Sequence, residues 1–224
     1  MSLSISIAPE LAGKVRLGVL VLDGVSVKSE NAALAAEIEA EGAELRSRYA
    51  GGPSADVPGA ADARALYKAL GLDPTKTRPS NEALLRRVLK GEALYRVNTL
   101  VDALNLSSLR YQLPFGLYDL ARVRPPVVLR KGRAGESYEG IRKGPVNVQD
   151  RPTLADEDGA FGNPTSDSAR TMITLQTTSA LVTCYAPAAY GLPRLRQVLD
   201  GTEEALRRAC GGKLVESQVL PAGG

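Results

Sequence analysis

Two blocks of polar side chains are the parts of this chain best equipped for chemistry, and the first holds two amides and a carboxylate. Asn98, Asp102 and Asn105 are four and three residues apart, so a helix would place them on one stripe. Asn and Asp compete with the backbone for hydrogen bonds, so these groups must be bonded to something specific. The partner is either a ligand or the bend PFGLYD that follows, which brings a second carboxylate, Asp119. Both alternatives stay open, because buried polar groups are normally paired with protein groups.

The second polar block is FGNPTSDSART, residues 161–171. A turn at Gly162-Asn163-Pro164 is followed by a carboxylate, a guanidinium and two hydroxyls, from Asp167, Arg170, Ser168 and Thr171. In a structural interpretation, Asp167 caps the next segment and Arg170 pairs with a carboxylate such as Asp119. In a functional one, the same groups bind a ligand.

The chain contains no histidine, which excludes Ser-His-Asp and Cys-His nucleophilic sites and imidazole general bases. Chemistry must therefore use carboxylates, hydroxyls, lysine or the substrate itself. The acidic run ADEDG, residues 155–159, matches no calcium loop and predicts a solvated turn. Glycine-rich phosphate loops are also missing, so we expect neither a metal ion nor a cofactor.

The length of 224 residues and the 44% apolar composition predict one folded domain over residues 1–224. Within it we expect a strand-helix extension over 1–60 and a core over 61–224. The start lacks the features of a secretory signal and no window is long enough to span a membrane, so the expected location is cytoplasmic. Cys184 and Cys210 have no metal-ligand spacing and are expected to be buried thiols.

Positive charge is concentrated in the middle of the chain. Residues 62–143 carry 16 basic and 8 acidic side chains, which is typical of a surface that attracts polyanions such as nucleic acid. Solvated helix faces explain the same charges equally well. On the helix expected after Ser80, the side chains that point away from the core are Arg86, Arg87 and Lys90, the candidates for RNA binding.

The expected order of elements is helices first and strands later, which favours an α+β fold. We expect a strand over 14–22, a helix capped by Ser29 and ending at Tyr49, a short helix over 61–70 and a helix capped by Ser80. Short strands then follow, and residues 147–171 are expected to be rich in loops. Strands over 172–175 and 179–185 and a helix over 193–210 close the chain.

VNTLVDALN followed by LPFGLYD resembles the pattern I-N-N-V-V-D-x-x-N and Q-P-x-H-A-F-D of the tRNA-binding and editing domain, the B-three/four region, of the phenylalanyl-tRNA synthetase beta subunit. The match keeps order and spacing at Asn98, Asp102, Asn105, Pro114 and Asp119. The resemblance spans about residues 78–190 and includes small freestanding proteins built around this domain. It implies an α+β fold with a central β-sandwich-like sheet flanked by helices.

The resemblance also implies tRNA as a partner. In the synthetase the domain hydrolyses tyrosine mischarged onto tRNA for phenylalanine, but here Gly116 replaces the histidine of the bend and Thr183 aligns with the editing glutamate. The synthetase editing groups are therefore not carried over. The resemblance covers no catalytic module for aminoacylation, so we expect that this chain is not a complete aminoacyl-tRNA synthetase.

Three functions stay open. The first is a tRNA-binding protein or trans-acting aminoacyl-tRNA deacylase, in which Asp102, Asp119 or Asp167 orients water. Its pocket would receive the aminoacyl end, with Gly116 opening the floor, and the expected substrate-binding residues are Asn98, Asn105, Gly116, Tyr118, Asn163, Ser168, Arg170 and Thr171. The second is a binder of an amino acid or another small molecule, in which Arg170 pairs with a carboxylate and Asp119 or Asp102 with an amine. The third is a non-catalytic interaction module.

Overall fold

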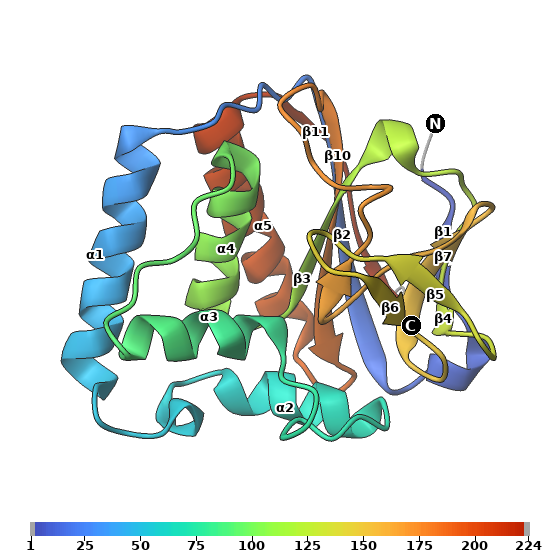
Figure 1. Cartoon of the computed structure of the whole chain (residues 1–224), viewed down its shortest axis with the longest axis horizontal. Helices are drawn as coiled ribbons and strands as arrows, with labels where there is room; N and C mark the ends of the chain where they lie inside the picture. Colours follow the sequence, from blue (N-terminus) through green and yellow to red (C-terminus); the bar gives the residue numbers. More distant parts are fainter. Residues whose placement is uncertain (1–2, 222–224) are drawn as a thin grey trace.

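The computed structural model describes residues 3–221 and has three layers: helices, a four-stranded sheet and a five-stranded sheet (Figure 1). The middle sheet is antiparallel and has the order β11 (Lys213–Leu220), β2 (Val15–Asp23), β10 (Ser179–Pro187) and β3 (Phe115–Asp119). The outer sheet has the order β1 (Ile5–Ile7), β4 (Val127–Lys131), β7 (Pro152–Asp156), β8 (Gly159–Asn163) and β9 (Ser166–Asp167). A separate hairpin joins β5 (Ser137–Glu139) and β6 (Pro145–Asn147). This arrangement confirms the expected α+β fold with a sandwich-like sheet.

The middle sheet is apolar on both faces because its strands bury both sets of alternating side chains. In β2, Leu17 and Val19 face the outer sheet, whereas Leu20 and Leu22 face the helices. A one-residue slip of this strand would exchange the two sets, so the two cores together fix its register.

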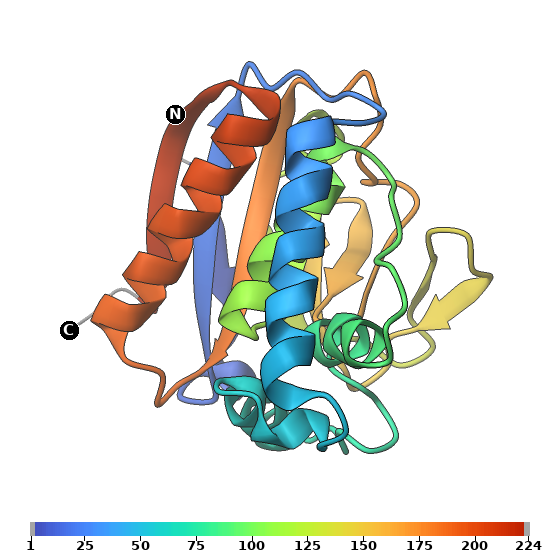
Figure 2. The ribbon, with the colours of Figure 1, turned by 90° about the vertical axis from the view of Figure 1, so that its left-hand side faces the viewer.

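Four helices cover the middle sheet on the side away from the outer sheet (Figure 2). They are α1 (Ala32–Tyr49), α3 (Ser80–Leu89), α4 (Thr99–Tyr111) and α5 (Leu192–Cys210). Helix α2 (Ala60–Ala69) instead closes one end of the sandwich, where Leu66 and Tyr67 join the core between the sheets. Short 3₁₀ turns lie at Pro9–Leu11, Ser54–Asp56 and Leu120–Arg122. No helix within residues 3–221 is long and apolar enough to cross a membrane.

Both helix caps expected from the sequence are wrong. Helix α1 begins after Asn31, whose side-chain oxygen accepts from the Leu34 N–H at 3.1 Å, so Ser29 is not its cap. Helix α3 follows Pro79 and includes Ser80 as its first residue, without a side-chain cap. Proline presets a suitable backbone angle at this point, which lets the helix begin without a capping hydroxyl.

Several strand boundaries also differ from expectation. Residues 172–175 are not a strand, whereas the stretch expected to be loop contains the hairpin of β7 and β8. The chain continues past α5 into β11, which pairs with β2. Because β2 lies between β10 and β11, the segment 1–60 contributes an inner strand to the middle sheet. Cys184 and Cys210 are buried free thiols, as expected.

Candidate functional site

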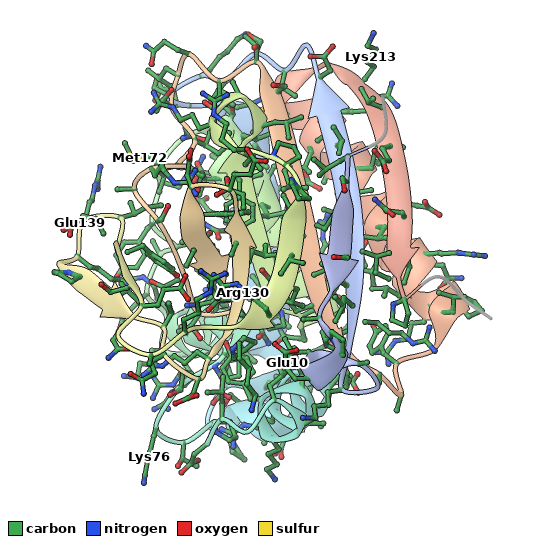
Figure 3. The ribbon with its side chains drawn as sticks, turned by 90° about the vertical axis from the view of Figure 1, so that its right-hand side faces the viewer. Glu10, Lys76, Arg130, Glu139, Met172 and Lys213 are labelled. Atoms are coloured by element: carbon green, nitrogen blue, oxygen red, sulfur yellow. The ribbon has the colours of Figure 1, made fainter. Side chains whose placement is uncertain are left out.

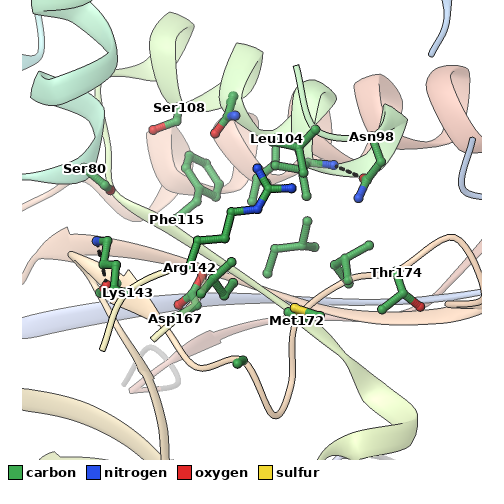
Figure 4. Close-up of a pocket in the computed structure, with 18 of the residues that line it drawn as sticks. Ser80, Asn98, Leu104, Ser108, Phe115, Arg142, Lys143, Asp167, Met172 and Thr174 are labelled. Carbon is green, nitrogen blue, oxygen red and sulfur yellow. Dashed lines mark hydrogen bonds between the residues drawn. The ribbon is translucent and has the colours of Figure 1, made fainter. Parts of the chain in front are cut away.

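A cavity of about 810 Å³ lies between α4, the tip of the β5–β6 hairpin and the loop 169–175 (Figure 4). Its walls are mostly apolar, from Leu84, Val101, Leu104, Phe115, Leu117 and Ile173. The polar groups are few and come from separate segments, an arrangement typical of small-ligand pockets. The candidate residues that line it are Asn98, Asn105, Asn163 and Asp167.

Asp167 is the one carboxylate that lines this cavity. Its Oδ1 atom is out of contact with solvent and has no hydrogen-bond partner among residues 3–221. Burial raises the pKa of Asp167 to about 7, and the Tyr118 hydroxyl, the Leu117 N–H and the Lys143 ammonium oppose part of that rise. The carboxyl therefore exchanges its proton near neutral pH, which suits a general acid or base.

A rigid turn holds Asp167 in place. The Asn163 Oδ1 atom accepts from the N–H groups of Thr165 and Ser166 at 2.8 and 2.9 Å. On the other side of the turn, the Tyr138 hydroxyl accepts from the Asn163 amide at 2.9 Å and donates to the Ser166 carbonyl. Burial raises the pKa of Tyr138, so its hydroxyl keeps the proton that it donates. Asn163 thus lines the cavity but is already bonded to protein groups.

The hairpin tip, residues 140–144, contributes two cations to the lining of the cavity. Figure 4 shows Arg142 reaching from the hairpin toward α4, above Asp167. Its guanidinium has no hydrogen-bond or ion-pair partner within the described residues 3–221. Lys143 donates to the Ser166 hydroxyl at 3.1 Å. The cavity therefore presents one carboxyl and two cations to a ligand, and Arg142 is free to bind an anion.

The two amides of the α4 stripe play different roles. Asn98 is the N-cap of α4 and accepts from the Val101 N–H at 3.0 Å. Asn105 lines the cavity two turns further along, and its amide makes no hydrogen bond to another residue of the range 3–221. Of the two, Asn105 is the one whose amide remains available to a ligand.

The other two candidate carboxylates lie outside the cavity and are bonded to protein groups. Asp102 is 1% exposed and accepts from the Arg96 guanidinium at 2.9 Å and the Val97 N–H at 3.0 Å. Asp119 accepts from the Thr177 hydroxyl at 2.8 Å and the Ala121 N–H at 3.1 Å. These bonds fix the start of α4 and the end of β3.

Arg170 is engaged by a carboxylate, as the structural interpretation expects, but the partner is Asp156 rather than Asp119. The two side chains meet through two hydrogen bonds of 2.8 and 3.1 Å. Ser168 and Thr171 are buried and bond to each other through their hydroxyls at 3.3 Å. None of Arg170, Ser168 and Thr171 lines the large cavity.

Gly116 and Tyr118 face the core between the two sheets, not the cavity. A Cβ atom on Gly116 would lie 2.1 Å from the Tyr118 hydroxyl oxygen, and one on Gly162 would lie 2.4 Å from it. The two glycines therefore make room for the Tyr118 ring, which is fully buried. The expectation that Gly116 opens a pocket floor is wrong, because the tyrosine fills that space. Thr183 pairs with Gly116 across the sheet and is buried as well.

Arg142 and Lys143 were not among the predicted site residues, because the short strands expected in this part of the chain were given no hairpin tip at 140–144. The usable signal was the segment GIRKG, residues 140–144, in which two glycines bracket two adjacent cations. Glycines flanking a polar pair mark a tight turn between strands. On such a turn, both cations project from the body of the protein.

The candidate RNA-binding residues lie on α3. Arg86 and Lys90 are exposed and have no ion-pair partner within residues 3–221. Arg87 is half-buried and pairs with Glu92 at 2.9 Å. Of the three, only Arg86 and Lys90 are therefore without an ion pair in the described part of the chain. No cluster of three or more Cys, Asp or Glu side chains that could hold a metal ion occurs in the described part of the chain.

The pKa of Asp167 predicts how stability changes with pH. A raised carboxyl pKa means that folding disfavours the charged form, so the cost is absent below the usual value of 3.8 and complete above about 7. Asp167→Asn should therefore raise the urea midpoint of unfolding at pH 8 and give little change at pH 4. An equal gain at both pH values would contradict the raised pKa.

Comparison with known proteins supplies a family and a fold. A family model described as the B3/4 domain matches residues 62–208, which is more than half of the chain. A crystal structure of an N-terminal fragment of the phenylalanyl-tRNA synthetase beta subunit from Pyrococcus horikoshii is similar in fold, with a TM-score of 0.52 and 11% identity. The alignment covers 99% of this chain and 55% of the fragment, so the chain spans about half its length. No curated protein matches.

These matches agree with the resemblance at Asn98, Asp102, Asn105, Pro114 and Asp119, all of which fall inside the matched range. The matched range also contains the segments that contribute most of the cavity lining, namely α3, α4, β3, the hairpin tip and residues 163–175. The chain belongs to the B3/4 domain family.

Proposed function

We propose that this protein binds the aminoacyl end of a tRNA in the cavity and hydrolyses the ester, acting in trans as an aminoacyl-tRNA deacylase. The observation that carries the proposal is the Asp167 carboxyl, which lines the cavity with a pKa raised to about 7, in a site that is also lined by Arg142 and Lys143. Membership of the B3/4 family and the fold of the synthetase fragment support tRNA as the partner.

In the proposed reaction, the Asp167 carboxylate takes a proton from a water molecule while the water oxygen adds to the ester carbonyl. Arg142 and Lys143 stabilise the oxyanion that forms on the carbonyl oxygen. When the bond between the carbonyl carbon and the ribose oxygen breaks, that oxygen receives the proton from Asp167. The products are the free amino acid and a tRNA with a free terminal hydroxyl, so no other reactant is needed.

The test is a deacylation assay of the purified protein against a panel of correctly and wrongly charged tRNAs. We expect faster loss of the amino acid from some of them than in buffer alone. Arg142→Ala should slow the reaction, since the oxyanion loses one cation. No acceleration on any member of a complete panel would overturn the proposal.

Binding of the tRNA body is a separate prediction about α3. Arg86→Glu with Lys90→Glu should weaken tRNA binding and make it less sensitive to salt, by about one unit of slope in log affinity against log salt for each lost phosphate contact. Filter binding at several salt concentrations measures that slope. Lys213→Glu is the matched control, because Lys213 is also an exposed cation. It lies on the side of the molecule opposite Met172 and Glu139 in the view of Figure 3. An unchanged slope in the double variant would exclude these residues from the interface.

The opposite charges in the cavity also favour a second function, the binding of a free amino acid. Arg142 would then pair with the carboxylate of the ligand, and Asp167 in its charged form with the ammonium group. Arg170, expected from the sequence to bind this carboxylate, is held by Asp156. Thermal-shift screening with the amino acids tests this alternative, since a ligand that binds the folded state raises the melting temperature. The gain should disappear in Arg142→Ala.

A further inference from the structure

Exposed apolar side chains gather around the mouth of the cavity. Seven large hydrophobic residues are exposed within residues 3–221, and four of them line this cavity: Val97, Ile141, Met172 and Leu175. A fifth, Tyr95, is two residues from Val97 and is the most exposed of all, at 65%. We call these five residues the collar. They come from three separate segments, and contiguous exposed apolar surface is a mark of an interaction site.

Tyr95 is held in position by a cation. The guanidinium carbon of Arg87 lies 4.1 Å from the centre of the Tyr95 ring, and Arg87 also donates to the Tyr95 hydroxyl at 3.0 Å. Arg87 is itself fixed by Glu92 at 2.9 Å and by the Ala93 carbonyl. One face of the ring therefore rests on a tethered guanidinium, while the ring as a whole stays largely open to solvent.

Two cations lie beside the collar residue Ile141, and the Glu92 carboxylate near Tyr95 is paired with Arg87. Arg142 and Lys143 extend beside Ile141, and both are exposed. Among residues 3–221, Asp167 is the only carboxylate that lines the cavity, and burial raises its pKa to about 7. An aromatic ring with a free face, apolar neighbours and unpaired cations is the combination that binds single-stranded nucleic acid: bases stack on the ring and phosphates meet the cations.

We propose that the collar binds the unpaired nucleotides at the end of an RNA strand, with one base stacked on Tyr95 and the backbone beside Arg142 and Lys143. That this strand is the aminoacylated end of a tRNA rests on the proposed function; the stacking site itself does not. Four of the five collar residues line the cavity and are exposed, so a strand bound there would direct its last nucleotide into the cavity toward Asp167.

The test uses an uncharged RNA stem-loop that carries a short single-stranded 3′ overhang, and the same stem-loop with a blunt end. Fluorescence anisotropy gives the affinity of each RNA. Tyr95→Ala should bind the overhang RNA roughly tenfold more weakly than the wild type, the loss expected for one stacked base. Tyr95→Phe keeps the ring and should bind within a factor of about two of the wild type.

Val215→Ala is the matched control, because Val215 is an exposed apolar residue of β11 outside the collar. It should leave both affinities unchanged. The proposal is overturned if Tyr95→Ala binds the overhang RNA as the wild type does, or if it weakens the blunt RNA equally. Because neither RNA carries an amino acid, a protein that fails to hydrolyse esters can still pass this test, so the two proposals fail separately.

Discussion

Replacement of Asp167 by Asn is expected to lower the rate of aminoacyl-ester hydrolysis by about 10² to 10⁴-fold, the usual contribution of a general base. The amide has nearly the shape of the carboxyl but cannot accept a proton from water. Because Asn is neutral, it also removes the cost of burying a charge, so the variant should fold at least as well as the wild type above pH 7. A loss of rate would then report chemistry and not unfolding.

The pH profile of hydrolysis gives the same carboxyl a second test. With a pKa of about 7, the rate above the uncatalysed background should rise up to neutral pH and level off beyond it. An ordinary aspartate would reach its plateau below pH 6. Asp102→Asn and Asp119→Asn serve as matched controls, since both carboxyls lie outside the cavity. If either control loses as much activity as Asp167→Asn while staying folded, our assignment of the base is wrong.

Substitution of Gly116 by Ala is expected to destabilise the fold by about 1–3 kcal/mol, the range for overpacking in a core. The added methyl group would lie 2.1 Å from the Tyr118 hydroxyl oxygen and 2.8 Å from the Thr183 Oγ1 atom. The tyrosine cannot retreat, because its hydroxyl also fills the space beside Gly162 and its ring packs edge-on against Phe161 at 4.9 Å between centroids.

Urea unfolding of four variants distinguishes this clash from a general effect of replacing glycine by alanine. Gly144→Ala is the control, since a Cβ atom there meets nothing within 4 Å; it should change the midpoint little. Adding Tyr118→Phe to Gly116→Ala should recover part of the loss, because it removes the closest atom. The double variant should thus be less destabilised than the two single changes predict together. Strict additivity would show that the methyl group and the hydroxyl do not meet.

The fold was predictable where apolar periodicity is strong. The alternation from Val15 to Leu22 predicts β2, and the helical stripes predict α1 and α5. It was not predictable where short strands are rich in glycine and polar residues. The hairpin Pro152–Asn163 carries an acidic turn that reads as solvated loop, and β11 carries Glu216 and Gln218 among its apolar residues. Of these strands, β7 pairs with β4 and β11 with β2, both distant in sequence, and no local pattern encodes such pairing.

The site was predicted in part, for a related reason. Spacing placed Asn98 and Asn105 on one side of α4, and composition singled out the turn that bears Asp167. Which carboxylate keeps a free oxygen depends on partners remote in sequence. Asp119 is bonded by Thr177, and Arg170 by Asp156, so neither remains available in the cavity. Side-chain pairing of this kind depends on the tertiary structure and cannot be predicted from the local sequence.

The two faces of strand β3 serve different parts of this protein. Its odd-numbered residues Phe115 and Leu117 face the cavity, while the even-numbered Gly116 and Tyr118 belong to the packing between the sheets. The residues on the two faces of the strand can therefore be substituted independently. In this protein, substitutions at 115 and 117 could change the ligand preference while Gly116 and Tyr118 keep their packing between the sheets. We therefore expect ligand selectivity to change more readily than the packing between the sheets.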